Sequence, residues 1–262
     1  MGKMETALRK AEHDRSDVLD PARGAARGAP GELAGGTATS FAISNSMRGE
    51  IDPHLVALAD PRSPQSEQYR ALRDRLLAIS PEQPLKVVVV TSSVPNEGKS
   101  VTCLNVAAVL AEDPTRRVCV VDADLRKPAL HKLLGIDNQR GLADYLGGGT
   151  MLEMVVQRSR LANLWILPAG RTPPNPSELL GGKRMDDLLA RLRRDYDWVV
   201  IDTPPVVSTT DAAVLAPRAD GTLLVVRMER TPREVARHAV ELLKKAKANV
   251  LGTVLTGVES AA

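Results

Sequence analysis

The chain has 262 residues, enough for one ordinary domain and a tail. Apolar residues make up 43% of it and aromatic residues only 2%, so the core must be aliphatic, as in central strands covered by helices. The net charge of +3 is too small to make nucleic acid the expected partner. Two cysteines outside any C-x-x-C pair exclude a disulfide framework and give no support to a zinc or iron–sulfur site. No apolar run approaches the ~20 residues of a membrane-spanning helix, so we expect a cytoplasmic protein without direct membrane insertion.

Residues 1–50 differ in composition from the rest of the chain. Ala7, Leu8 and Ala11 could share one side of a short helix, and a stretch rich in Gly, Ala, Pro and Ser follows it. We expect a flexible segment that is either a fraying tail or a docking helix that folds on a partner. Residues 51–262 form the expected domain.

The domain alternates helical and strand patterns. The first helix lies within residues 63–80, with Tyr69, Leu72, Leu76 and Ile79 on one side. Short apolar runs, typical of buried strands, cover residues 85–91, 117–123, 163–169, 197–203, 221–227 and 249–255. Helical stretches between them cover residues 100–110, 183–194, 209–215 and 232–246. This order predicts an α/β sandwich of the P-loop NTPase type, with a mostly parallel central sheet and helices on both faces. Ligands of such sheets bind beyond the carboxyl ends of the strands.

A candidate phosphate loop, TSSVPNEGKS, follows the first strand and opens a helix. Backbone N–H groups of such a loop converge on phosphate oxygens, and Gly98 permits a close approach. Lys99 is placed to reach the β- and γ-phosphates and the Ser100 hydroxyl to bind magnesium. Because Ser93 replaces the first glycine of the usual pattern, an ordinary helix start is the alternative. The expected nucleotide-binding residues are Ser93, Pro95, Asn96, Glu97, Gly98, Lys99, Ser100 and Val101.

Carboxylates end two other predicted strands. Asp122 and Asp124 are two residues apart in an extended stretch, so they point the same way and repel unless a cation lies between them. Asp202 ends the strand VVID and precedes two prolines. A polar turn with a capping Asp is the alternative for the first pair. Three phosphate- or metal-suited sequences at three strand ends of one sheet together predict a site for ATP and Mg²⁺.

These motifs, SSVPNEGKS, VVDADLRKP and VVIDTPP, resemble the nucleotide motifs of the bacterial tyrosine kinases that govern capsule and exopolysaccharide synthesis. The resemblance runs from about Ile51 to Gly257. It implies that Lys99, Asp122, Asp124 and Arg126 are catalytic, with Asp122 as the base for the acceptor hydroxyl. The expected magnesium ligands, which bind the ion directly or through water, are Ser100, Asp122, Asp124 and Asp202. The motif Glu67, Arg70 and Arg73 matches one that joins subunits into a ring, although a solvated, salt-bridged face is the alternative.

The chain departs from this family in three ways. Tyr69, Tyr145 and Tyr196 are its only tyrosines, so the residues after Val258 hold none of the C-terminal tyrosines that relatives phosphorylate. Thr256 stands where many relatives have asparagine. The membrane-spanning activator domain fused to some relatives is absent, which implies an activator or polysaccharide co-polymerase on a separate chain at the inner face of the membrane.

Two other functions fit the same motifs. A partitioning or septum-positioning ATPase would carry a second lysine where this chain has Val94. An ATP-controlled assembly switch of a polysaccharide export complex would hydrolyse ATP without a protein acceptor. The intact Lys99, Asp122 and Asp124 favour the kinase.

Overall fold

The computed structural model describes residues 49–79 and 85–258. Seven strands form one sheet in the order β3-β4-β2-β5-β1-β6-β7. All neighbouring strands are parallel except β3 and β4, which are antiparallel. The strands are β1 (Val87–Ser92), β2 (Val118–Asp122), β3 (Gln157–Arg158), β4 (Leu164–Leu167), β5 (Trp198–Asp202), β6 (Gly221–Arg227) and β7 (Val250–Thr256). The predicted parallel sheet is therefore confirmed.

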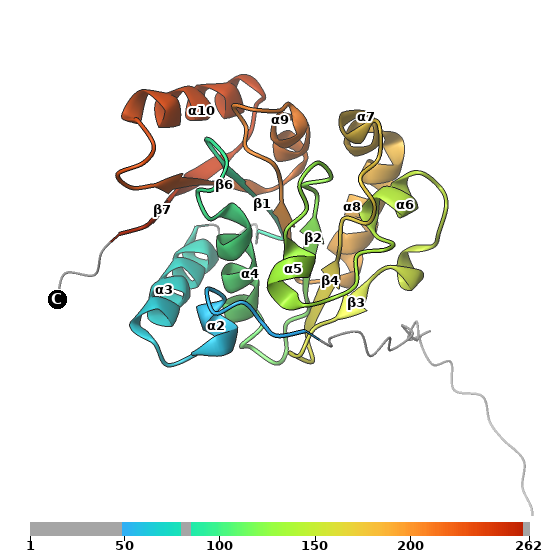
Figure 1. The fold of residues 1–262 in the computed structure, drawn as a ribbon, viewed down its shortest axis with the longest axis horizontal. Helices are drawn as coiled ribbons and strands as arrows, with labels where there is room; N and C mark the ends of the chain where they lie inside the picture. Colours follow the sequence, from blue (N-terminus) through green and yellow to red (C-terminus); the bar gives the residue numbers. More distant parts are fainter. Residues whose placement is uncertain (1–48, 80–84, 259–262) are drawn as a thin grey trace, which may run out of the picture. The chain divides into compact units, whose positions relative to one another are not determined.

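Helices cover both faces of the sheet because successive side chains of a strand point to opposite faces. In β1, Val87 and Val89 belong to one apolar cluster, and Val88 and Val90 belong to another. The first cluster is completed by the short helix α6 (Leu142–Leu146), α7 (Pro176–Gly181) and α8 (Lys183–Asp195). The second is completed by α3 (Pro64–Ala78), α4 (Lys99–Leu110) and α5 (Leu130–Leu134). Figure 1 shows these two groups of helices on either side of the strands.

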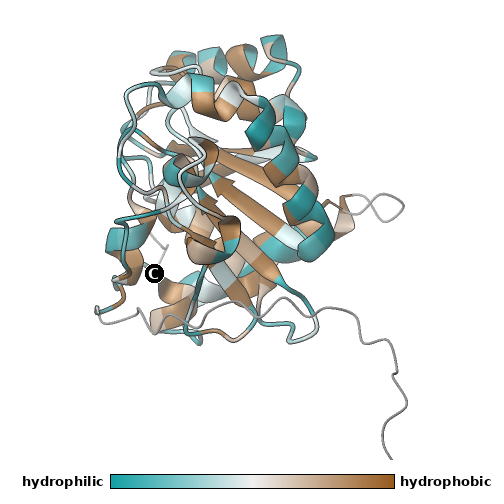
Figure 2. Cartoon of the chain, turned by 90° about the vertical axis from the view of Figure 1, so that its right-hand side faces the viewer, coloured by the Kyte–Doolittle hydropathy of each residue, from teal (hydrophilic) through white to brown (hydrophobic). Residues whose placement is uncertain are grey.

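A third apolar cluster lies at the β6 end of the sheet, where α9 (Asp211–Leu215) and α10 (Arg233–Lys245) pack. The remaining short elements are α2 (Val56–Ala59) and the 3₁₀ turns η1 (Leu152–Met154) and η2 (Ala216–Arg218). Figure 2 shows the consistently hydrophobic strands between helices whose outer sides are hydrophilic. The buried aliphatic core thus follows from the composition.

The six predicted strands and five predicted helices are confirmed, with ends displaced by a few residues. Two details were wrong. Ile79 was expected on the buried side of its helix but follows the last turn of α3, where its side chain is 46% exposed. The last predicted strand was expected to resemble the buried ones, yet β7 is an edge strand and Leu255 is 52% exposed.

Two further expectations concern the N-terminal segment and membrane-spanning helices. The possible docking helix near Ala7 and Leu8 lies outside the described residues. Within residues 49–79 and 85–258, no helix is long and apolar enough to cross a membrane.

Candidate active site at the carboxyl ends of the strands

Three neighbouring strands bring the predicted site residues to one edge of the sheet. The phosphate loop follows β1, Asp202 ends β5, and Asp122 ends β2. Asp122 and Asp202 are direct register partners on adjacent parallel strands. Side chains separated by about 80 positions in the sequence therefore meet, as the motif positions predicted.

The backbone of the phosphate loop has a conformation that lets a ligand approach it closely. Asn96 and Gly98 have positive φ angles of 67° and 89°, and α4 begins immediately afterwards at Lys99. A side chain at position 98 would be strained in this conformation, which only glycine adopts freely. The Ser93 hydroxyl is buried and has no hydrogen-bond partner among the described residues, so it is available to a ligand. Pro95 and Asn96 are exposed at the tip, and Val101 in the first turn of α4 packs partly on the core.

Glu97 plays a part that the sequence motif did not predict. Its expected contact with nucleotide rests on the loop backbone, because Glu97 is only 2% exposed and its side chain faces the protein. Its carboxylate accepts hydrogen bonds from the backbone N–H of Val94 (2.8 Å), the backbone N–H of Arg227 (3.2 Å) and the Thr231 hydroxyl. The side chain thus fastens the loop to the segment after β6. A local sequence motif does not indicate this role, because the partners Arg227 and Thr231 are distant from Glu97 in the sequence.

Lys99 lies among the carboxylates. Its Nζ is 2.8 Å from Asp124 Oδ2 and 3.4 Å from Asp202 Oδ1, and its side chain is only 11% exposed. Burial alone would lower the pKa of Lys99, but the negative charges of Asp202 and Asp124 outweigh it and raise that pKa above its ordinary value. The lysine is therefore a permanent cation at the place where phosphates are expected.

The negative charge of the acidic residues in the site exceeds the positive charge around them. Burial first, and then the neighbouring Asp202, raise the pKa of Asp122 above its ordinary value. Asp122 accepts hydrogen bonds from the backbone N–H groups of Asp124 (3.2 Å) and Leu130 (3.1 Å). The Ser100 hydroxyl donates to Asp202 Oδ2 at 2.6 Å. Three buried carboxylates face one lysine, an imbalance that a divalent cation would offset.

This donor set fits magnesium. In the part of the chain that the structure describes, no group of three or more His, Cys, Asp or Glu side chains is arranged to hold a metal on its own. Mg²⁺ does not need such a cage, because it keeps several waters and binds one or two carboxylates together with substrate phosphates. The Ser100 hydroxyl and the Asp202 carboxylate, already in contact, are the residues that would hold it, with Asp122 and Asp124 beside them.

Arg126, predicted to be catalytic, lies at the margin of this group. Its Nε donates to Asp211 Oδ2 at 2.7 Å, and its Nη2 donates to the Ser177 hydroxyl at 2.8 Å. Asp211 is completely buried at the start of α9, and this ion pair joins the segment after β2 to α7 and α9. The Arg126 side chain is 41% exposed, so it remains partly accessible to solvent.

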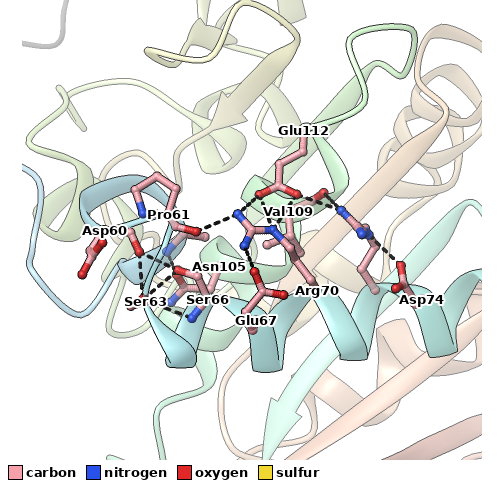
Figure 3. Close-up of polar contacts among 12 residues, drawn as sticks. Asp60, Pro61, Ser63, Ser66, Glu67, Arg70, Asp74, Asn105, Val109 and Glu112 are labelled. Atoms are coloured by element: carbon pink, nitrogen blue, oxygen red, sulfur yellow. Dashed lines mark hydrogen bonds and ion pairs between the residues drawn. The ribbon is translucent and has the colours of Figure 1, made fainter.

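The motif Glu67, Arg70 and Arg73 forms ion pairs within the chain (Figure 3). Arg70 contacts both Glu67 (2.5 Å) and Glu112 (2.6 Å), and Arg73 contacts Glu112 (2.8 Å). Glu112 follows the end of α4, so these arginines hold α3 against α4. The salt-bridged face, which was the alternative to a subunit contact, is therefore present.

Comparisons with known proteins agree with this geometry. A ParA family model, described as NUBPL iron-transfer P-loop NTPase, matches residues 84–256. The chain is 37% identical over 217 residues to tyrosine-protein kinase YwqD of Bacillus subtilis, covering 83% of this chain and 91% of that protein. It is 39% identical over 220 residues to putative tyrosine-protein kinase EpsB of Ralstonia nicotianae, covering 84% of this chain but only 29% of that protein. The kinase domain of Escherichia coli tyrosine kinase ETK has a TM-score of 0.74 and 32% identity, covering 79% of this chain and 83% of that one.

Proposed function

This chain belongs to the bacterial tyrosine-protein kinase family of P-loop NTPases, and we propose that it uses ATP and Mg²⁺ to phosphorylate tyrosine in proteins of capsule or exopolysaccharide synthesis. The observation that carries the proposal is the meeting of Lys99, Asp124 and Asp202 beneath a phosphate loop, with Asp122 beside them. A phosphate-binding cation and a carboxylate base within one edge of a sheet are the parts that phosphoryl transfer requires.

Each of the site residues then has a defined role in phosphoryl transfer. The backbone of the phosphate loop and the Lys99 ammonium bind the β- and γ-phosphates and orient the γ-phosphorus. Asp122 receives the proton of the acceptor tyrosine as the tyrosine oxygen bonds to the γ-phosphorus. The bond between the γ-phosphorus and the β–γ bridging oxygen breaks, and phosphotyrosine and ADP result. Magnesium, when bound, neutralises charge that develops on the phosphate oxygens.

Labelled ATP tests this function. The parent protein, with Mg²⁺ and a tyrosine-containing peptide, should transfer label to tyrosine, and phosphoamino-acid analysis should identify it. Asp122→Asn should reduce transfer by at least about 100-fold because a positioned base contributes 10²- to 10⁴-fold. Asp187→Asn, which changes an exposed carboxylate on α8, is the matched control and should retain activity. Release of inorganic phosphate without labelled tyrosine would favour the hydrolysing switch and refute the kinase.

The assembly proposal concerns subunits and a membrane partner. We infer that copies of the chain form a ring through the Glu67, Arg70 and Arg73 face of α3, and that an activator on a separate chain recruits them to the inner side of the membrane. Complementary charge across a heterologous contact can close into a ring. The intrachain pairs with Glu112 leave Glu67, 66% exposed, as the group best able to reach a neighbour.

Light scattering separates the two roles of these arginines. Replacing both Arg70 and Arg73 with Glu should give monomers, but it also removes their intrachain pairs. Glu112→Gln removes the ion pairs that Arg70 and Arg73 form with Glu112 and keeps both arginines, so it should leave the oligomer intact. A ring that survives the double charge reversal would assign this face to stabilising α3 alone.

A further inference from the structure

A basic cavity of about 730 Å³ lies beside the catalytic carboxylates. Its walls come from the segment after β2, from α5 and from the loop after β4. The ionisable side chains that line it are Arg126, Lys127, His131, Lys132 and Arg171, and no Asp or Glu is among the lining residues. A concentration of one sign of charge in a hollow attracts ligands of the opposite sign.

Most of this positive charge is uncompensated. Arg126 is paired with the buried Asp211, so its charge is offset. Lys127, Lys132 and Arg171 are exposed and form no ion pair with any carboxylate in residues 49–79 and 85–258. These three cations therefore make no ionic contribution to the fold and remain available to a ligand.

The cavity extends the active site in one direction. Along the sheet edge the phosphate loop lies over β1, Asp202 ends β5, Asp122 ends β2, and the cavity opens beyond β2 toward β4. The connection is direct, because Asp124 Oδ1 accepts the backbone N–H of Lys127 at 3.0 Å. The basic cavity is thus on the far side of the carboxylates from the phosphate loop. The proposed kinase needs its acceptor to approach Asp122 from a side that the nucleotide phosphates do not occupy.

We propose that this cavity binds acidic side chains that flank the acceptor tyrosine of the protein substrate. The proposal rests on the kinase function and specifies its substrate class. A volume of about 730 Å³ is in the range of sites for whole small ligands, so it can hold several side chains of a peptide segment. Carboxylates from such a segment would pair with Lys127, Lys132 and Arg171 while the tyrosine lies at Asp122.

Binding to the full-length chain can be measured without catalysis. The probes are two fluorescent peptides with a central phenylalanine in place of the acceptor tyrosine, one flanked by glutamates and the other by glutamines. By anisotropy, the glutamate peptide should bind at least about fivefold more tightly, as expected for two exposed ion pairs. This preference should shrink at ~1 M salt, where charges are screened within ~3 Å.

Variants decide whether the cavity is responsible. The double variant Lys132→Gln with Arg171→Gln should lose most of the preference for the glutamate peptide, because Lys127 alone of the three unpaired cations remains. Lys245→Gln, which removes an exposed charge on α10 at the other end of the sheet, should keep the preference. Equal binding of the two peptides by the parent, or an undiminished preference in the double variant, would overturn the proposal.

The same peptides with tyrosine restored separate this inference from the proposed function. A protein that prefers the glutamate peptide yet never labels its tyrosine has the acidic-peptide site but is not this kinase. A protein that labels both tyrosine peptides and binds both equally is a kinase without this site.

Discussion

The hydroxyl of Thr256, at the end of β7, donates a hydrogen bond to the backbone carbonyl of Glu97 in the phosphate loop, with an Oγ1–O distance of 2.7 Å. The Glu97 carboxylate adds bonds to the backbone of Arg227 and to the Thr231 hydroxyl. The loop is therefore held in shape by strands and turns on its far side, and Thr256, noted in the sequence as an unusual residue, supports the loop.

Glu97→Gln tests this support. A glutamine side chain has one acceptor oxygen, so at least one of the three donors around position 97 would face another donor. We expect the KM for ATP to rise by about tenfold, from a loss of ~1.4 kcal/mol, while kcat changes little. Steady-state kinetics over a range of ATP concentrations measures both quantities. Glu241→Gln, at an exposed position of α10, is the control, and an unchanged KM in Glu97→Gln would show that the loop keeps its shape without the carboxylate.

Lys99→Met should abolish ATP binding and also destabilise the fold. The ammonium lies within 3.4 Å of two buried carboxylates, and removing it leaves their charge uncompensated. Breaking a buried pair costs about 3 kcal/mol of unfolding free energy. Calorimetry with ATP and urea denaturation test the two effects separately. An unchanged urea midpoint would mean that the carboxylates find other partners, and near-parental ATP affinity would contradict the placement of the phosphate loop.

Asp220 makes stability depend on pH. It accepts hydrogen bonds from the backbone N–H groups of Lys86 (2.8 Å) and Val87 (2.7 Å) and pairs with Arg193. Burial would raise its pKa, but the bonds from Val87, Arg193 and Lys86 outweigh burial and lower that pKa below the ordinary value. The stabilisation is therefore complete above about pH 4, the pKa of an unfolded chain, and disappears as the pH falls through the lowered value.

The variant Asp220→Asn should accordingly lose about 1–2 kcal/mol of unfolding free energy at neutral pH. Its difference from the parent should narrow at pH values below about 4. Urea titrations at several pH values measure this difference. A gap that stays constant down to about pH 2 would assign the loss to packing and not to the carboxylate charge.

The tyrosines of the described domain should be poor acceptors in the folded protein. Tyr196 is 3% exposed, with its ring centroid 5.5 Å from that of Trp165. Tyr69 packs on the core, and the guanidinium of Arg184 lies 5.4 Å from the ring centroid of Tyr145. Mass spectrometry after incubation with ATP and Mg²⁺ should find little phosphate at any of them, and less at Tyr196 than at the partly exposed Tyr145. A synthetic peptide spanning residues 139–152 is the control, and abundant phosphate at Tyr196 in the folded protein would contradict the prediction.

The regular elements and the ligand-facing motifs could be predicted because their signals are local. Runs such as VVVV at 87–90 indicate a strand buried on both faces, and all of β1 is buried. The short helices α2, α5 and α7 were not expected, since four to six residues are too few to establish a helical period. The two-residue strand β3 is set by pairing with β4 and has no pattern of its own.

Prediction of the site was limited by partners that are distant in the sequence. The meeting of Asp122 and Asp202 could be inferred because both end parallel strands. The inward turn of Glu97 could not, because it depends on Arg227 and Thr231. The basic cavity also escaped notice, since Arg171 joins Lys127 and Lys132 only when β4 lies beside β2.

The strand order has a consequence for how the protein is made. β1, which carries the phosphate loop, is flanked by β5 and β6, both encoded late in the chain, so it has no neighbouring strand while most of the domain is still being synthesised. Pairing strands that are this far apart in the sequence costs loop-closure entropy before any contact between them can form. Such pairing is therefore slow. The ribosome must therefore release nearly the whole domain before ATP can be bound, and a chain interrupted before β5 would leave β1 as an unpaired valine strand that is prone to aggregate.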